Sequence, residues 1–80
     1  MELRHIYQIA NVINEKMDYN KDMLKDISIT VKVSPTTHFS IDKEFYRLTN
    51  DTTDGFVHED VINAVIDGIN FTILDKTKEV

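Results

Sequence analysis

Residues 27–33 alternate strictly between apolar and polar side chains, and this run constrains the fold more than any other part of the sequence. Successive side chains of a strand point to opposite faces, and branched side chains favour strands, so the run predicts a strand that is buried on one face. Pro35 should end it, because proline has no amide hydrogen to donate to a ladder. The inward positions are Ile27, Ile29, Val31 and Val33, and the solvent positions are Ser28, Thr30 and Lys32.

Helices are expected before and after this strand in the chain. Over residues 2–17, apolar side chains recur at steps of three and four, which predicts an amphipathic helix with Val12 on its polar side. Residues 57–67 are predicted to form a second helix that ends at Gly68. The apolar positions of the first helix are Leu3, Ile6, Ala10, Ile13 and Met17.

Residues 39–48 fit two different periods. Phe39 and Ile41 alternate as in a strand, whereas Ile41 and Phe45 would share one face of a helix. We favour a second strand that begins near His38 and continues irregularly through this segment.

Together these elements predict a two-layer α+β sandwich in the order α-β-β-α-β, with the last strand over residues 69–73. Because each clear strand has one polar face, both helices should pack on the other face of a small, mostly antiparallel sheet of about three strands. A chain of 80 residues cannot divide its apolar residues between two cores, so residues 1–80 are expected to form one domain with a frayed tail at 76–80. The inward residues of the last strand are Ile69, Phe71 and Ile73.

The sequence contains no cysteine. A small secreted domain usually needs disulfides, so their absence favours a reducing compartment. Residues 1–5 lack the basic start and apolar run of a signal peptide, and no apolar stretch is long enough to span a bilayer. We therefore expect a cytoplasmic protein that does not contact a membrane.

No pattern in the sequence indicates catalysis or a bound cofactor. A calcium-loop match beginning at Asn50 fails, because Val61 stands where a bidentate glutamate is required. Two glycines cannot build a phosphate-binding loop, and no serine lies in a nucleophile elbow. We expect no enzyme activity, no metal and no cofactor. The histidines, which lack the spacing of metal ligands, are His5, His38 and His58.

Acidic residues are concentrated in one part of the chain. The net charge is −5, and residues 42–67, with seven acids and two bases, account for all of it. Such a field repels phosphate and attracts basic surfaces, so direct binding of nucleic acid is not expected. The candidate partner-binding residues lie on one stripe of the helix predicted over 57–67 and in the loop before it: they are Asp51, Asp54, Glu59, Asp60, Asn63 and Asp67.

Two hypotheses about function follow. The first is a small acidic accessory protein that binds and inhibits a larger host protein with a basic surface, although a purely solubilising role explains the same acidic residues. The second is a structural or self-assembling protein that forms a homodimer or larger homo-oligomer through a strand edge, or through a helix face at Val12. Small, acidic, cysteine-free chains rich in Ile, Asn, Lys and Asp resemble the accessory proteins of bacteriophages and mobile elements, and this resemblance in composition favours the first hypothesis.

Overall fold

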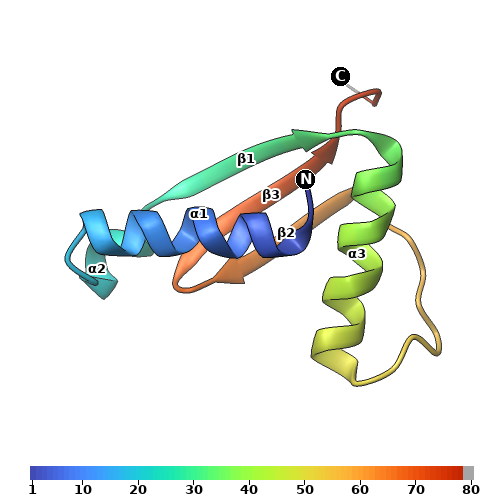
Figure 1. Cartoon of the computed structure of the whole chain (residues 1–80), viewed down its shortest axis with the longest axis horizontal. Helices are drawn as coiled ribbons and strands as arrows, with labels where there is room; N and C mark the ends of the chain where they lie inside the picture. Colours follow the sequence, from blue (N-terminus) through green and yellow to red (C-terminus); the bar gives the residue numbers. More distant parts are fainter. Residues whose placement is uncertain (79–80) are drawn as a thin grey trace.

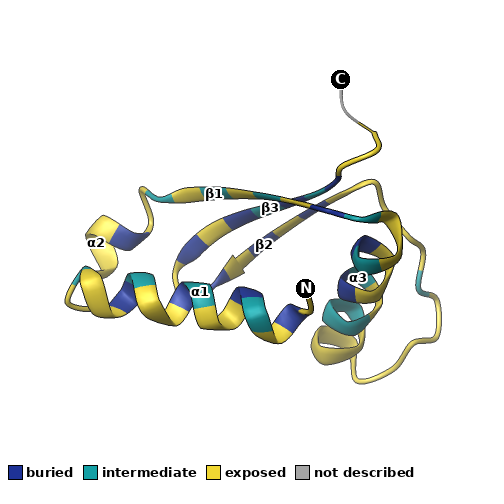
Figure 2. Ribbon diagram, turned by 45° about the horizontal axis from the view of Figure 1, so that its top comes forward, coloured by how far each residue is buried: buried dark blue, intermediate teal, exposed yellow. Residues whose placement is uncertain are grey.

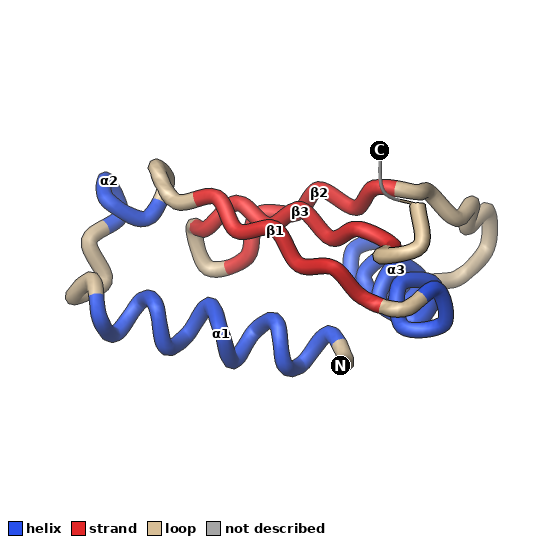
Figure 3. The backbone as a smooth tube through the Cα atoms, turned by 90° about the horizontal axis from the view of Figure 1, so that it is seen from above, coloured by secondary structure: helices blue, strands red, loops and turns tan. Residues whose placement is uncertain are grey.

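The computed structural model describes residues 1–78, which form a three-stranded mixed sheet and three helices (Figure 1). In chain order the elements are α1 (Leu3–Lys16), α2 (Lys21–Leu24), β1 (Ser28–Val33), α3 (Pro35–Asn50), β2 (Val61–Ile66) and β3 (Ile69–Asp75). The strand order is β1-β3-β2, with β1 parallel and β2 antiparallel to the central β3. The α+β class and the three-stranded sheet agree with the sequence, and α1 and α3 lie on the same side of that sheet (Figure 3).

The elements with the clearest periodicity form as predicted. In β1, Val33 is buried, whereas Ser28 and Thr30 on the opposite face are exposed. All three inward residues predicted for β3 are buried, with Phe71 only 1% exposed. α1 turns its apolar stripe to the sheet, and Val12 on its far side is 52% exposed. A period of two or of 3.6 sustained over a whole element therefore sufficed to place these three elements.

The strand favoured over residues 39–48 is wrong, because this segment lies within α3. Ser34 caps the helix by accepting a hydrogen bond from the amide of Thr37 at 3.3 Å. Pro35 occupies the first turn, where an amide hydrogen would have no helical partner anyway, so the residue that ends β1 also begins α3. In a strand, Phe39 and Ile41 would lie on one face and be buried to a similar extent. Instead Ile41 is 1% exposed and Phe39 is 46% exposed, so their apparent alternation has no structural meaning.

The helix predicted over residues 57–67 is also wrong. Residues 51–60 form a loop, and Val61–Ile66 form β2, whose side chains alternate between exposed and buried. Asp67 and Gly68 have φ angles of 50° and 84°, as in the two-residue turn of a tight hairpin. Gly68 therefore turns the chain between two strands instead of ending a helix. The order is α-β-α-β-β, apart from the short α2, and one of the two strand pairings is parallel.

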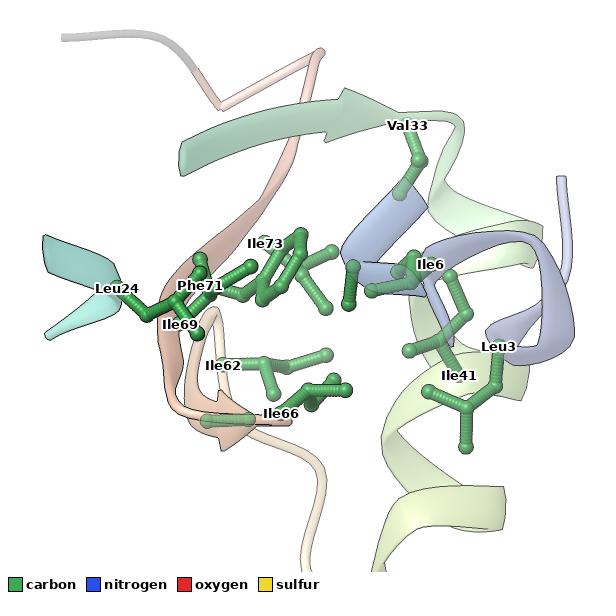
Figure 4. Close-up of a cluster of buried hydrophobic side chains, with 12 residues drawn as sticks. Leu3, Ile6, Leu24, Val33, Ile41, Ile62, Ile66, Ile69, Phe71 and Ile73 are labelled. Atoms are coloured by element: carbon green, nitrogen blue, oxygen red, sulfur yellow. The ribbon is translucent and has the colours of Figure 1, made fainter. Parts of the chain in front are cut away.

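The core is one cluster of buried apolar side chains from α1, α2, α3 and all three strands (Figure 4). Phe71 and Ile73 of β3 lie opposite Ile6 of α1 and Ile41 of α3. Burial is uneven across the sheet, because β3 and β2 bury their inward residues whereas most inward residues of β1 are only half-buried (Figure 2). The core is thus closed at the β2 edge and partly open at the β1 edge.

The first residues of the tail predicted at 76–80 are held against the domain. The amide of Lys76 donates to the carbonyl of Val33 at 2.8 Å, which continues the ladder beyond β3. The ammonium group of Lys78 lies 2.6 Å from a carboxylate oxygen of Asp60. Residues 79–80 lie outside the described part of the chain.

Candidate functional site

The loop of residues 51–60 folds back along α3 and is held there by aromatic side chains. Phe39 and Tyr46 lie two helical turns apart on one face of α3. The ring of Phe56 packs against both, with ring centroids 5.7 Å from Phe39 and 5.5 Å from Tyr46. The Tyr46 hydroxyl donates to the carbonyl of Asp54 at 2.9 Å. The loop therefore runs antiparallel to α3 in a defined position.

Gly55 permits the close approach of this loop to Tyr46. Its φ angle is +77°, a conformation that residues with a side chain rarely adopt. A Cβ atom added at Gly55 would lie 3.3 Å from the Tyr46 hydroxyl oxygen. A larger residue would therefore be strained in its backbone and would press on the group that holds the loop.

A carboxylate of α3 fixes the far end of the loop. One oxygen of Asp42 lies 2.9 Å from Nδ1 of His58 and accepts a second hydrogen bond, of 3.0 Å, from the amide of Glu59. Because its neighbour is an acceptor, Nδ1 of His58 carries the proton. The side chains of Asp42 and His58 are 14% and 30% exposed, so water competes only in part for this contact.

A second histidine is buried behind the first. His38 is 0% exposed, and its Nε2 lies 3.1 Å from the carbonyl oxygen of Ile73, which makes Nε2 the donor. Its Nδ1 has no hydrogen-bond partner among residues 1–78. The His58 ring stands edge-on to it with centroids 5.0 Å apart, so the two rings pack together where the loop meets β3.

A groove lies between α3, the loop and the start of β2. We call it the α3–β2 groove; its volume is about 390 Å³. The carboxylates of Asp42 and Glu59 border it, and Val57 at its rim is 75% exposed. None of its lining residues is lysine or arginine, so no permanently charged cation in the lining offsets Asp42 and Glu59. The lining residues are Asp42, Phe45, Tyr46, Thr49, Gly55, Val57, Glu59, Ile62 and Asn63.

A second groove, between α1 and α3, differs in its charge. Its volume is about 410 Å³, and it is lined by Arg4 as well as by Glu2 and Glu44. Arg4 lies 2.7 Å from Glu2, and Glu44 lies 2.6 Å from Arg47. The Arg47 hydrogen bond holds the pKa of Glu44 below its usual value. Each of its acids is therefore paired with an arginine, whereas the lining of the α3–β2 groove contains no arginine or lysine.

Of the six residues proposed from the sequence, two meet in the α3–β2 groove: Glu59 and Asn63. Asp51 ends α3 in the left-handed conformation, and Asp54 uses its carbonyl to hold Tyr46. The other two, Asp60 and Asp67, lie at opposite ends of the six-residue β2, roughly 20 Å apart. The single acidic stripe expected on a helix does not exist, because the segment is a strand.

Asp60 and Asp67, which lie outside the groove, both have structural roles. Asp60 accepts a hydrogen bond from Lys78, and this bond lowers the pKa of the Asp60 carboxyl. Asp67 lies in the hairpin turn, where its carbonyl accepts a 3.2 Å hydrogen bond from the side chain of Asn14. The residue that the sequence reasoning missed is Asp42. The signal for it is the i, i+3, i+7 spacing of Phe39, Asp42 and Tyr46, which places all three on one face of a helix but not on one face of a strand.

Within residues 1–78, no three histidine, aspartate or glutamate side chains are arranged so that they could hold a metal ion. No helix in the same range is long and apolar enough to cross a membrane.

Compared with protein-family models, curated proteins and solved structures, the chain matches none of them.

Proposed function

We propose that the chain is a small acidic accessory protein that binds a larger protein by holding a basic side chain of that partner in the α3–β2 groove. The observation that carries the proposal is that two acidic residues, Asp42 and Glu59, line this groove together with no lysine or arginine. Charges in a partly enclosed site are screened less by water than charges on an open surface, so this pair attracts a cation more strongly than scattered surface acids do.

The lining favours arginine as the bound side chain. Phe45 and Tyr46 offer aromatic surface beside the carboxylates, and a guanidinium group both stacks on aromatic rings and bonds to carboxylates through two parallel hydrogen bonds. Asp42 retains bonding capacity, since an ionised carboxylate offers about four lone-pair sites and its contacts to His58 and Glu59 occupy two.

In this proposal the chain inhibits its partner because it covers a basic patch that the partner needs. A basic patch on a larger protein commonly serves to hold phosphate or another acidic partner, and an acidic protein bound there blocks that use. The charge of residues 42–67 would steer the encounter, so association should slow as salt is added.

The test uses the tagged full chain to capture proteins from a bacterial lysate, followed by calorimetric titration of the purified captured protein. Glu59→Lys should lose the partner, because it places a cation in the groove. Glu15→Lys is the matched control, since it makes the same charge change on an exposed site of α1, away from the groove. Glu15→Lys should bind as the unmodified chain does.

Two outcomes would refute the groove as the binding site. One is equal affinity of the captured protein for Glu59→Lys and for the unmodified chain. The other is loss of the partner in the double variant Asp60→Lys, Asp67→Lys while Glu59→Lys retains it, because those two acids lie outside the groove.

A further inference from the structure

The outer edge of β1 has no strand beside it. In the strand order β1-β3-β2, β1 lies at one edge of the sheet. The carbonyls of Ile27 and Val33 accept from β3 and its extension, at 3.2 and 2.8 Å. Backbone groups alternate in direction along a strand, so the amides and carbonyls of Ser28 and Thr30 point away from β3. No strand among residues 1–78 pairs with this side (Figure 3).

The core is also incomplete at this edge. Ile29 and Val31 point inward but are only half-buried, whereas Ile62, Ala64 and Ile66 at the other edge of the sheet are 5%, 8% and 3% exposed. The strand has no proline, and its register with β3 runs without a bulge, so it lacks two of the features that usually keep edge strands apart.

α1 also has apolar side chains that are incompletely buried against this core. Ile9 and Ile13 are half-buried beside the core, and Val12 is 52% exposed. With His5 and Gln8 they line a shallow apolar hollow of about 350 Å³. We call the surface formed by Ile9, Val12, Ile13, Ile29 and Val31 the α1–β1 side.

The distribution of charge along the chain allows two copies to associate through the α1–β1 side. Residues 1–41, which include α1 and β1, contain five acidic and five basic residues, whereas the net charge of −5 resides in residues 42–67. Contact through the α1–β1 side therefore joins the neutral parts of two chains and leaves their acidic parts apart. The α3–β2 groove lies toward the opposite edge of the sheet and would stay open.

We propose that the α1–β1 side binds a second copy of this chain, with the two β1 strands pairing antiparallel about a two-fold axis at Thr30. In an antiparallel pair, residues whose backbone groups point toward the partner strand must face each other, so the axis falls on a residue and not between two. With the axis at Thr30, Ile29 of each copy lies opposite Val31 of the other, and Ile27 lies opposite Val33. All four inward residues of the strand then face apolar residues.

The size of the contact sets the expected strength. The domain is 18 Å thick along its shortest axis. A side of that thickness along a strand about 20 Å long would bury roughly 700 Å² in total over the two copies, which is below the size of a standard specific interface and typical of a weak contact. The dimer is therefore reversible and dilution separates it.

Sedimentation velocity of the full chain over a series of concentrations tests this proposal. The mass should rise from the 9.3 kDa of one chain toward twice that value as concentration increases. Thr30→Pro should remain monomeric at every concentration, because it removes an amide that points toward the second copy without removing a bond to β3. Val65→Pro is the matched control: the register places its amide on the free side of β2, and it should dimerise normally.

Hydrogen exchange of the unmodified chain locates the contact. The amides of Ser28 and Thr30 should become protected as concentration rises, whereas the amide of Val65 should not. If Thr30→Pro fails to fold, Val12→Lys replaces it, since that exposed residue is not part of the core. A strict monomer, a dimer that persists in the folded Thr30→Pro or Val12→Lys variant, or a dimer lost in Val65→Pro would each overturn the proposal. None of these results depends on the partner proposed for the groove.

Discussion

Asp42 of α3 and His58 of the following loop are joined by a 2.9 Å contact across sixteen residues of sequence. The same carboxylate oxygen also accepts a hydrogen bond from the amide of Glu59, so one side chain holds His58 and one wall of the α3–β2 groove in place. The groove therefore depends on a loop that has no secondary structure of its own and is held by a few named contacts.

Asp42→Ala should loosen that loop. It removes two hydrogen bonds from a carboxylate that is 14% exposed, and it should lower the free energy of unfolding by about 1–3 kcal/mol. Denaturant unfolding measures the loss, and hydrogen exchange at the Glu59 amide should accelerate by more than the global change explains. Asp22→Ala, at an acid whose side chain is 92% exposed, is the control and should change stability little. Unchanged protection at Glu59 in Asp42→Ala would contradict the role given to this carboxylate.

Gly55→Ala should also disturb the loop, through the backbone. The positive φ angle and the 3.3 Å approach to the Tyr46 hydroxyl both oppose a Cβ atom, and we expect a loss of about 1 kcal/mol in unfolding experiments. Tyr46→Phe removes the crowded oxygen together with its bond to Asp54. The double variant should therefore lose less than the sum of the two single changes, because they act on one contact. Strictly additive losses would show that the crowding is unimportant.

Asn14 joins α1 to the β2–β3 turn, and its replacement should be costly. The residue is 7% exposed, and its side-chain amide donates to the carbonyls of Ala10 at 2.9 Å and Asp67 at 3.2 Å. Asn14→Ala removes the side-chain donor of the Asp67 carbonyl, which should lower the free energy of unfolding by about 1–2 kcal/mol. The better helix propensity of alanine partly offsets this loss. Asn14→Asp should be worse than Asn14→Ala in thermal melts, because it directs a carboxylate at two carbonyl oxygens. The reverse order would show that helix propensity, not the tie to the turn, governs this position.

How far the sequence predicted the fold depends on the range over which each signal acts. Strict alternation in residues 27–33 and 69–73 was sufficient, since burial on one face follows directly from a period of two. In residues 57–67 the apolar residues were dense enough to satisfy a helical wheel as well. The pair Asp67-Gly68, flanked by alternating apolar residues, was the local signal for a hairpin that should have decided between the two.

The groove could not be predicted in the same way. Asp42 and Glu59 meet only because the loop returns along α3, and this return depends on contacts between aromatic residues on α3 and in the loop, such as Tyr46 with Phe56. No single element contains both carboxylates, so no periodicity links them. The concentration of acids in residues 42–67 singled out the segment that contains both carboxylates, but its placement on a helix assigned the wrong neighbours to Asp60 and Asp67.

Asp75 should contribute to the acid sensitivity of the fold. It accepts hydrogen bonds from the hydroxyl and the amide of Thr77, at 2.6 and 2.9 Å, and these bonds hold the pKa of its carboxyl below the usual value. A carboxyl with a lowered pKa in the folded state adds stability above its unfolded pKa of about 3.9, and that stability is lost as the pH falls through the lower folded value. Asp75→Asn should therefore flatten the fall of stability at pH below about 4, measured by denaturant unfolding across pH. Thr77→Val should also flatten this fall of stability. Adding Thr77→Val to Asp75→Asn should not change the slope further. If stability falls as steeply at low pH in Asp75→Asn as in the unmodified chain, other carboxylates cause the acid sensitivity.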